Sequence, residues 1–309
     1  MRIVFMGTPN AAVPSLERLL HDGHEIAAVY TQPDRPSGRG NKITFSRVKE
    51  YALKHDLQIV QPVKIKTPET FAEFTSHQAD LAVVVAYGRI LPETLLNAFP
   101  MGAINVHFSL LPKYRGAAPV NWAIVNGETE TGVTIIQMDA GLDTGAILLQ
   151  RSTRIDPAEN AIELMTRLAS MGAGLLSETL RDLRELTTAE QDHENATFAP
   201  IMTRDDGLIN WNMRAGRISN RIRGFQPFPS AFTFHCGQKI TLWKAVPGDT
   251  VDHGTAGEII QAYGDALLVR CGEGTILSVE ELQPEGKRRM TARDFLNGTK
   301  IRSGDTLGV

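Results

Sequence analysis

Apolar runs of strand length alternate with amphipathic stretches through the first half of the chain. The first buried strand is predicted over residues 2–7, and an amphipathic helix follows over 13–20. Further strands are predicted over 24–31, 79–86, 102–108 and 132–138. Further helices are predicted over 46–54, 68–74, 92–98, 119–126 and 161–183. This alternation predicts an α/β fold with a Rossmann-like, mostly parallel sheet covered by helices on both faces.

The pattern changes after the long helix. Residues 186–200 are polar and have no sustained period, which is typical of a linker. Short alternating runs broken by Gly and Pro follow, over 232–236, 239–244, 257–262, 266–270 and 274–282. Strands this short and this regularly spaced predict a small OB-like β-barrel. We therefore expect a catalytic domain over 1–185, a linker over 186–204 and a barrel domain over 205–309.

Composition narrows the class of protein. Of the 309 residues, 42% are hydrophobic, which excludes disorder as the main state. The strongest apolar run, residues 81–86, is too short to cross a membrane, and no signal-peptide pattern follows the first Met. Cys236 and Cys271 are too few for a disulfide framework or a four-cysteine zinc site. We expect a cytoplasmic protein with no membrane partner.

The net charge differs between the two parts of the chain, but it is small in both. Residues 205–309 carry 13 Lys and Arg against 12 Asp and Glu, whereas residues 1–204 carry 19 against 23. Neither part has the strong basic excess of a protein that binds nucleic acid by bulk charge, so such a partner would be bound by local patches.

The turn after the first strand argues against several enzyme classes. Gly7-Thr8-Pro9 stands where a dinucleotide fold has its glycine fingerprint, but the second and third glycines are absent, which disfavours a nicotinamide or flavin site. The chain also has no P-loop, no His-Glu-x-x-His and no Gly-x-Ser-x-Gly motif. Kinase, zinc-protease and α/β-hydrolase chemistry therefore lack their usual residues.

One stretch carries side chains suited to acyl transfer. Asn105 and His107 are two residues apart at the end of a predicted strand, so they point to one face. Asp139 and Asp143 lie in a Gly-rich loop after the next strand, which we expect at the same carboxyl edge of the sheet. Amide and imidazolium donors stabilise an oxyanion, and a carboxylate orients the imidazole. From spacing alone, a turn-capping pair and ordinary turn chemistry remain open alternatives.

These residues belong to motifs that run through nearly the whole chain. The central ones are Asn105-x-His107, Ser109-Leu110-Leu111-Pro112-x-x-Arg115-Gly116 and Asp139-Ala140-Gly141-Leu142-Asp143-Thr144-Gly145. Others are Thr31-Gln32-Pro33-Asp34-Arg35-Pro36-x-Gly38-Arg39-Gly40, Val84-Val85-Ala86-Tyr87-Gly88, Asp206-Gly207-x-Ile209-x-Trp211 and Ile222-Arg223-x-Phe225-x-Pro227-x-Pro229. With them the sequence resembles the formyltransferases that use 10-formyltetrahydrofolate, and within these the branch that formylates methionyl-tRNA.

The resemblance implies a reaction and its residues. The formyl group would move from 10-formyltetrahydrofolate to the free amino group of methionyl initiator tRNA, for translation initiation. Asn105 and His107 would stabilise the tetrahedral oxyanion, and Asp143 would hold His107 and help to move the proton. The folate is a group carrier, and no metal or nicotinamide takes part in the chemical step. The implied folate-binding residues are Tyr87, Gly88, Ile90, Ser109, Leu110, Leu111, Pro112 and Asp139.

Two basic segments fit a tRNA partner. The loop over residues 32–42 carries Arg35, Arg39 and Lys42 among Gly and Pro, so it can meet phosphates near the acceptor end. Further along, three arginines three and four residues apart form one stripe if the segment is helical, namely Arg214, Arg217 and Arg221. Solvated surface charge is the alternative for each segment. No protein partner is implied.

Other functions share some of these features. A sugar-nucleotide or glycinamide ribonucleotide formyltransferase would use the same Asn, His and Asp residues, and hydrolysis of formyltetrahydrofolate is a further possibility. A non-catalytic folate- or RNA-binding module is the alternative from a different class. The basic loop over 32–42 and the segment over 211–229 favour the tRNA acceptor.

Overall fold

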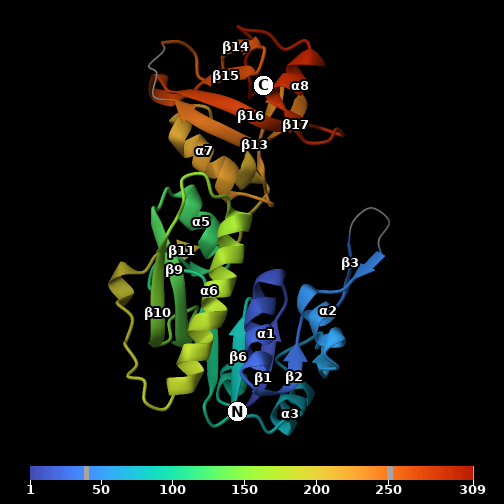
Figure 1. Ribbon diagram of the computed structural model, residues 1–309, viewed down its shortest axis with the longest axis vertical. Coiled ribbons are helices and arrows are strands. Elements are labelled where there is room, and N and C mark those ends of the chain that lie inside the picture. Colours follow the sequence, from blue (N-terminus) through green and yellow to red (C-terminus); the bar gives the residue numbers. More distant parts are fainter. Residues whose placement is uncertain (38–41, 249–252, 309) are drawn as a thin grey trace. The chain divides into compact units, whose positions relative to one another are not determined.

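A computed structural model describes residues 1–37, 42–248 and 253–308 (Figure 1). The chain divides into two compact units, each built from several stretches. Unit 1 comprises Met1–Pro119, Glu130–Arg154 and Met165–Ala199. Unit 2 comprises Val120–Thr129, Ile155–Leu164 and Pro200–Val309.

Unit 1 is built on a seven-stranded sheet with the strand order β10-β9-β7-β6-β1-β2-β5. Its strands are β1 (Arg2–Gly7), β2 (Glu25–Tyr30), β5 (Ile59–Val60), β6 (Leu81–Val85), β7 (Ala103–His107), β9 (Glu130–Gln137) and β10 (Ile147–Arg154). The first five run parallel, whereas β9 pairs antiparallel with both β7 and β10. The expected α/β fold with a mostly parallel sheet is confirmed.

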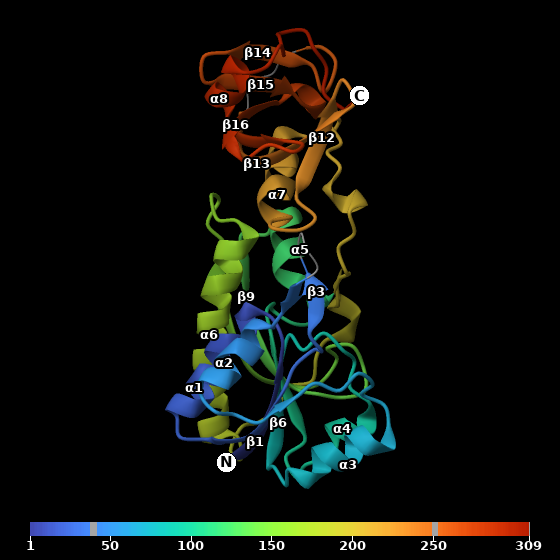
Figure 2. The same cartoon turned by 90° about the vertical axis from the view of Figure 1, so that its right-hand side faces the viewer.

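Helices cover both faces of this sheet. They are α1 (Val13–His21), α2 (Arg47–Lys54), α3 (Pro68–Ser76), α4 (Glu93–Leu96), α6 (Ala161–Asp182) and the short η1 (Asn10–Ala12). Figure 2 shows α1 and α6 on one face and α3 and α4 on the other. Local chemistry sets where they begin: the side chains of Ser46 and Thr67 accept hydrogen bonds from the backbone amides of Lys49 and Thr70.

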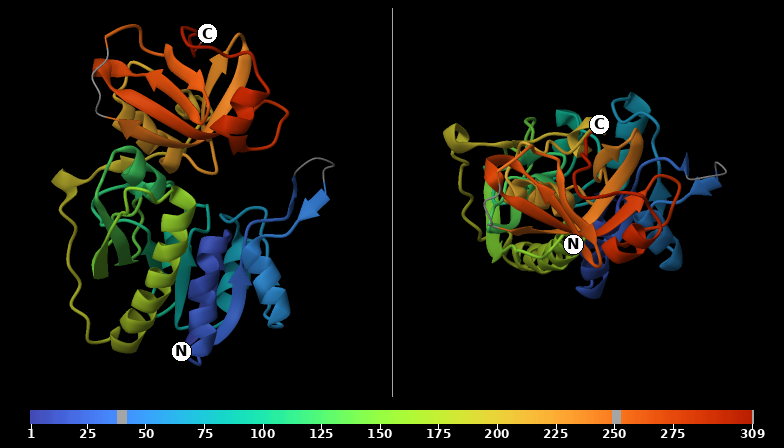
Figure 3. Two further views of the ribbon diagram at one scale, coloured as in Figure 1. Left: turned by 45° about the horizontal axis from the view of Figure 1, so that its top comes forward. Right: turned by 90° about the horizontal axis from the view of Figure 1, so that it is seen from above.

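Part of the loop predicted over 32–42 is a hairpin. Strands β3 (Arg35–Ser37) and β4 (Lys42–Thr44) pair antiparallel, and the residues between them lie outside the described ranges. The base of the hairpin is fixed because Asp34 accepts hydrogen bonds from Lys49 and Gln61. The hairpin projects beyond α2 (Figures 1 and 3).

The segment expected to be a linker is attached to unit 1. Strand β11 (Phe198–Ala199) pairs parallel with β8 (Arg115–Gly116), and Ala189 forms a bridge with Ile147. The short helix η2 (His193–Asn195) lies between these two attachments. This polar segment, which has no apolar period to bury, is therefore attached to unit 1 by backbone hydrogen bonds.

Unit 2 contains a six-stranded antiparallel sheet, curved in Figure 3, in which β12-β13-β16-β15-β14 are neighbours and β17 pairs with β16. Its strands are β12 (Ala231–His235), β13 (Gln238–Gly248), β14 (Ile259–Tyr263), β15 (Ala266–Arg270), β16 (Ile276–Pro284) and β17 (Met290–Thr291). Its helices are α5 (Pro119–Val125), α7 (Ala215–Gly224), α8 (Ala292–Asn297), η3 (Asp205–Gly207) and η4 (Gly272–Gly274). Ile218 and Ile222 of α7 pack into its core with Trp211. The short alternating runs are confirmed as an antiparallel sheet domain.

Within the described ranges, no helix is both long and apolar enough to cross a membrane.

Two glycines in the interior of α6 differ sharply in their surroundings. A Cβ on Gly172 would lie 2.9 Å from a methyl group of Val106 and 3.4 Å from the ring of Phe108. A Cβ on Gly174 would meet nothing within 4 Å. The missing side chain at Gly172 therefore lets α6 approach the sheet directly behind His107.

We expect Gly172→Ala to lower the free energy of unfolding by about 1–3 kcal/mol, because it overpacks the contact with β7. Gly174→Ala, two residues away in the same helix, should raise stability by up to about 1 kcal/mol through helix propensity. Thermal unfolding of both variants checks this. Equal shifts in Tm would contradict a close approach at Gly172.

Candidate active site

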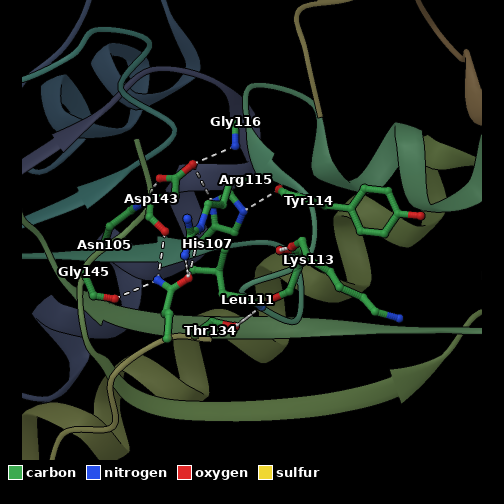
Figure 4. A network of polar contacts seen from close by, with 12 residues as sticks. Asn105, His107, Leu111, Lys113, Tyr114, Arg115, Gly116, Thr134, Asp143 and Gly145 are labelled. Atoms are coloured by element: carbon green, nitrogen blue, oxygen red, sulfur yellow. Dashed lines mark hydrogen bonds and ion pairs between the residues drawn. The ribbon is translucent and has the colours of Figure 1, made fainter. Parts of the chain in front are cut away.

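Strand β7 delivers two polar side chains to the same face of the sheet. Asn105 and His107 alternate along it, and only 9% and 5% of each residue is exposed. A charged or polar group this buried needs hydrogen-bond partners. Figure 4 shows that these come from loops that lie over this face.

Asp143 is the residue to which both side chains turn. Its carboxylate accepts a hydrogen bond of 2.8 Å from the backbone amide of Gly116 and one of 3.4 Å from Nδ2 of Asn105. Nδ1 of His107 lies 3.6 Å from the same carboxylate. The structure therefore brings Asn105, His107 and Asp143 together.

The path of the loop that carries Asp143 differs from the one expected. Strand β9 runs antiparallel to β7, and its last residue, Gln137, pairs with Ile104. Strand β9 therefore ends beside the amino-terminal end of β7. The Asp143 loop, residues 138–146, therefore starts at the opposite edge and crosses the face of the sheet. The expectation that both loops lie at one carboxyl edge is wrong, because an apolar run does not encode strand direction.

The ring of His107 has a defined orientation. Its Nε2 lies 3.0 Å from the carbonyl oxygen of Tyr114. Since a carbonyl oxygen only accepts hydrogen bonds, Nε2 carries a hydrogen and Nδ1 is the nitrogen that faces Asp143.

The partners of His107 and Asp143 come from one short turn, Tyr114–Gly116. Tyr114 has a φ of 62° and donates its amide hydrogen to Thr197 Oγ1 at 2.9 Å. Gly116 has a φ of 120°, and a Cβ there would lie 2.8 Å from the carbonyl oxygen of Ala199. Glycine is required at this position because the backbone of β11 passes so close.

Two buried residues complete the network, and sequence reasoning gave neither of them a role. Arg115, 4% exposed, donates to Oε1 of Gln191 over 3.1 and 2.6 Å. Nε2 of Gln191 donates in turn to the carbonyl oxygens of Asp143, at 2.8 Å, and Gly145, at 2.7 Å. Arg115 stood in a recognised motif, but no local pattern marks Gln191, which lies in a polar stretch without periodicity.

The segment Ser109–Pro112, implied to bind folate, forms a turn with several internal partners. Ser109 is fully buried and donates through Oγ to the carbonyl oxygen of Lys113 at 2.6 Å. The amide of Leu111 donates to Oγ1 of Thr134 at 3.2 Å, and the side chain of Leu110 packs against Gly132 of β9. The side chains of Ser109 and Leu111 point inward.

The other implied folate residues differ in exposure. Tyr87 is 1% exposed, and burial raises the pKa of its phenol, so its side chain belongs to the core. Gly88 and Ile90 are exposed, with Ile90 at 69%. Asp139 is also exposed, and its carboxylate accepts hydrogen bonds within its own loop, including 2.6 Å from Thr144 Oγ1.

The basic residues expected to contact tRNA lie in the hairpin and in unit 2. In the hairpin, Arg35 is exposed in β3, while Arg39 and the side chain of Lys42 lie outside the described part of the chain. In unit 2, Arg214 and Arg217 line a groove of about 820 Å³ beside α7 and β13. This α7 groove is also lined by Trp243, Lys244, Arg289, Asn160 and Glu163.

Arg221 does not share the exposure expected of a basic stripe. It is half-buried, donates to the backbone carbonyl of Asp206 and lies over the ring of Phe225 at 4.8 Å from its centroid. Burial lowers the pKa of its guanidinium. Helical spacing predicts one face for Arg221 and Arg217. The side chain of Arg221 instead turns toward the carbonyl oxygen of Asp206, which lies before the helix and outside its pattern.

Comparison with known proteins adds independent evidence. Residues 1–180 match the formyl transferase family, and residues 201–300 match the formyl transferase C-terminal domain. A methionyl-tRNA formyltransferase of Caldanaerobacter subterraneus is 48% identical over 310 residues, covering 99% of this chain and 100% of the relative. One from Acetivibrio thermocellus is 46% identical over 311 residues, covering all of both chains.

Solved structures share the fold. An N-formyltransferase from Helicobacter canadensis in complex with folinic acid and dTDP-3-aminofucose has a TM-score of 0.69 at 20% identity, covering 91% of this chain and 98% of its own. The sugar 3N-formyl transferase WlaRD has a TM-score of 0.68 at 20% identity, covering 93% and 99%. The family matches over residues 1–180 and 201–300, together with the full-length relatives, show that the chain belongs to the methionyl-tRNA formyltransferase family.

Proposed function

We propose that Asn105, His107 and Asp143 catalyse transfer of the formyl group from 10-formyltetrahydrofolate to the free amino group of methionyl initiator tRNA. The observation that carries this proposal is the convergence of the three side chains on one buried face, with the His107–Asp143 separation of 3.6 Å. The product is N-formylmethionyl-tRNA, used in translation initiation, and the reaction takes place in the cytoplasm.

The reaction needs donors for a developing negative charge. The methionyl amine attacks the formyl carbon, the carbonyl oxygen becomes an oxyanion, and the bond from carbon to N10 then breaks. Nδ2 of Asn105 and protonated Nδ1 of His107 are the donors available to that oxygen, since Nε2 of His107 is already bound by Tyr114. Both donors are buried, which strengthens their effect on the transition state.

Asp143 supports this chemistry in two ways. Its carboxylate, 13% exposed, stabilises the imidazolium of His107, so that the ring donates a hydrogen bond and does not accept one. The carboxylate also relays a proton. It accepts, through water, the proton that the attacking amine loses, and this proton is passed on to N10 of the folate. No proton is lost or gained overall, since the amine gives up one and N10 receives one.

The exposed loops beside the site suit a flat, partly apolar co-substrate. Ile90 and Leu142 expose 69% and 49% of their surface, although both are large apolar residues. We propose that the pterin of the folate covers them, with backbone around Gly88 and Asp139 supplying polar contacts. The Ser109–Pro112 turn would then contribute shape and backbone groups, because its Ser109 and Leu111 side chains are buried.

The tRNA would be held by basic residues on both units. We propose Arg35, Arg39 and Lys42 of the hairpin and Arg214 and Arg217 of the α7 groove as phosphate contacts. The antiparallel sheet of unit 2 would serve as an OB-like barrel, a fold that binds oligonucleotides on its surface. Irregular pairing of β13 with β16 favours the curvature that such a barrel requires.

We expect the protein to form product with 10-formyltetrahydrofolate and initiator Met-tRNA only. Elongator Met-tRNA, free methionine and a 4-amino sugar nucleotide should give none. Release of tetrahydrofolate and the formylated product are followed together. Product with the sugar nucleotide and not with tRNA would keep the catalytic residues and refute the proposed acceptor.

His107→Ala should lower kcat roughly 10²- to 10³-fold while folate binding stays within about twofold, because the substitution removes a donor to the developing oxyanion. Asp143→Asn should lower kcat in the same direction. The matched control is His21→Ala on an exposed helix end, with 79% of its side chain exposed. Unchanged turnover in His107→Ala would remove this residue from the mechanism.

Arg217→Ala should weaken tRNA binding and reduce the slope of log Kd against log salt by about one unit, because one phosphate contact is lost. Arg221→Ala should instead lower Tm, because it removes a half-buried hydrogen bond and the stack on Phe225. Salt titration and thermal unfolding separate the two effects. A loss of salt dependence in Arg221→Ala alone would reverse these assignments.

A further inference from the structure

Gln191 is a buried residue of the segment after α6, and the chemistry of the site does not use it directly. Only 5% of it is exposed, and both ends of its amide are bound. We propose that Gln191 is a positioning residue for Asp143: it fixes the backbone of the Asp143 loop and joins it to Arg115. This proposal rests on the proposed function of Asp143.

The backbone at Asp143 is in a conformation that costs free energy for any residue with a side chain, although aspartate tolerates it better than most. Its φ is 53°, in the left-handed region, where a side chain carries a steric cost. Two residues on, Gly145 is so confined that a Cβ would lie 1.8 Å from the carbonyl oxygen of Gln137. Such a turn persists only when its surroundings hold it.

Gln191 supplies that hold at both ends of the turn. Its Nε2 donates to the carbonyl oxygens of Asp143 and Gly145, at 2.8 and 2.7 Å. These bonds use both hydrogens of the amide nitrogen. The carbonyls on either side of the strained turn are thereby fixed to one rigid group.

Arg115 determines which way the amide of Gln191 points. Its guanidinium donates twice to Oε1 of Gln191 and lies 3.0 Å from Nδ1 of His193. Because a guanidinium only donates, the oxygen of the amide faces Arg115 and the nitrogen faces the Asp143 loop. Gly116, the next residue, donates its amide to the Asp143 carboxylate at 2.8 Å.

Asp143 is thus held from two sides by neighbouring elements. The Tyr114–Gly116 turn holds its carboxylate, and Gln191 holds its backbone. Release of the backbone would let the carboxylate move relative to Nδ1 of His107, which already lies at 3.6 Å. Misplacement of a catalytic group by about 1 Å costs roughly 100-fold in rate, so the loss should be in kcat.

The decisive variant is Gln191→Glu. It keeps the length of the side chain and an oxygen for Arg115, but it replaces the amide donor that holds the two carbonyls by an acceptor. We expect kcat to fall roughly 10- to 100-fold, with KM for Met-tRNA and for the folate within about twofold. The matched control is Asn121→Asp in unit 2, an amide whose Nδ2 also donates to two backbone carbonyls, those of Gly224 at 2.7 Å and Gln226 at 3.4 Å. Its kcat should stay within about twofold of the parent.

A double-substitution cycle identifies the residue through which Gln191 acts. If Gln191 works through Asp143, Gln191→Glu should change kcat little once Asp143→Asn is present. An equal fall in both backgrounds would overturn the proposal, because Gln191 would then act elsewhere. An unchanged kcat in folded Gln191→Glu would overturn it as well.

The same measurements separate this proposal from the function it rests on. If Asp143→Asn alone keeps the parent kcat, the proposed role of Asp143 fails, and the role of Gln191 fails with it. If Asp143→Asn loses activity and Gln191→Glu does not, only the role of Gln191 fails. Thermal unfolding precedes the kinetics, and Gln191→Met, which is neutral and of similar length, replaces Gln191→Glu if that variant does not fold.

Discussion

The imidazole of His107 lies between two oxygen atoms, the carbonyl oxygen of Tyr114 and a carboxylate oxygen of Asp143. These two contacts determine the tautomer of the imidazole and which of its nitrogens faces Asp143. Neither acceptor comes from the strand that carries His107. The strand determines which way the side chain of His107 points, and two loops provide its hydrogen-bonding and ionic partners. The geometry of the site therefore depends on what holds those loops in place.

The alternation of apolar and polar residues was sufficient to predict much of unit 1. The strand 2–7 and the helix 161–183 lie within one residue of the observed bounds, since each buries a clear apolar pattern against the sheet. The pairing of Asn105 and His107 on one face followed from strand periodicity alone. Their roles needed the resemblance, because spacing does not distinguish a catalytic pair from a turn.

The features that the sequence did not predict share one physical cause. The direction of β9, the bend of Arg221 toward a distant carbonyl and the attachment of Gln191 to the Asp143 loop all depend on contacts between residues far apart in the chain. A polar stretch such as 186–200 has no apolar period to bury. Its position comes from backbone pairing and buried amide contacts, which leave no local pattern.

The pairing of β8 with β11 also bears on the order in which the protein matures. Ribosomes make the chain from its amino end, so Asn105, His107 and Asp143 all emerge before Phe198 and Ala199 exist. Until then Gly116 lacks the backbone neighbour that confines it. A nascent chain that stops after α6 holds the three side chains proposed to do the chemistry but lacks strand β11, which pairs with β8 beside them. The proposed site is therefore complete only late in synthesis, once the polar segment after α6 has been made.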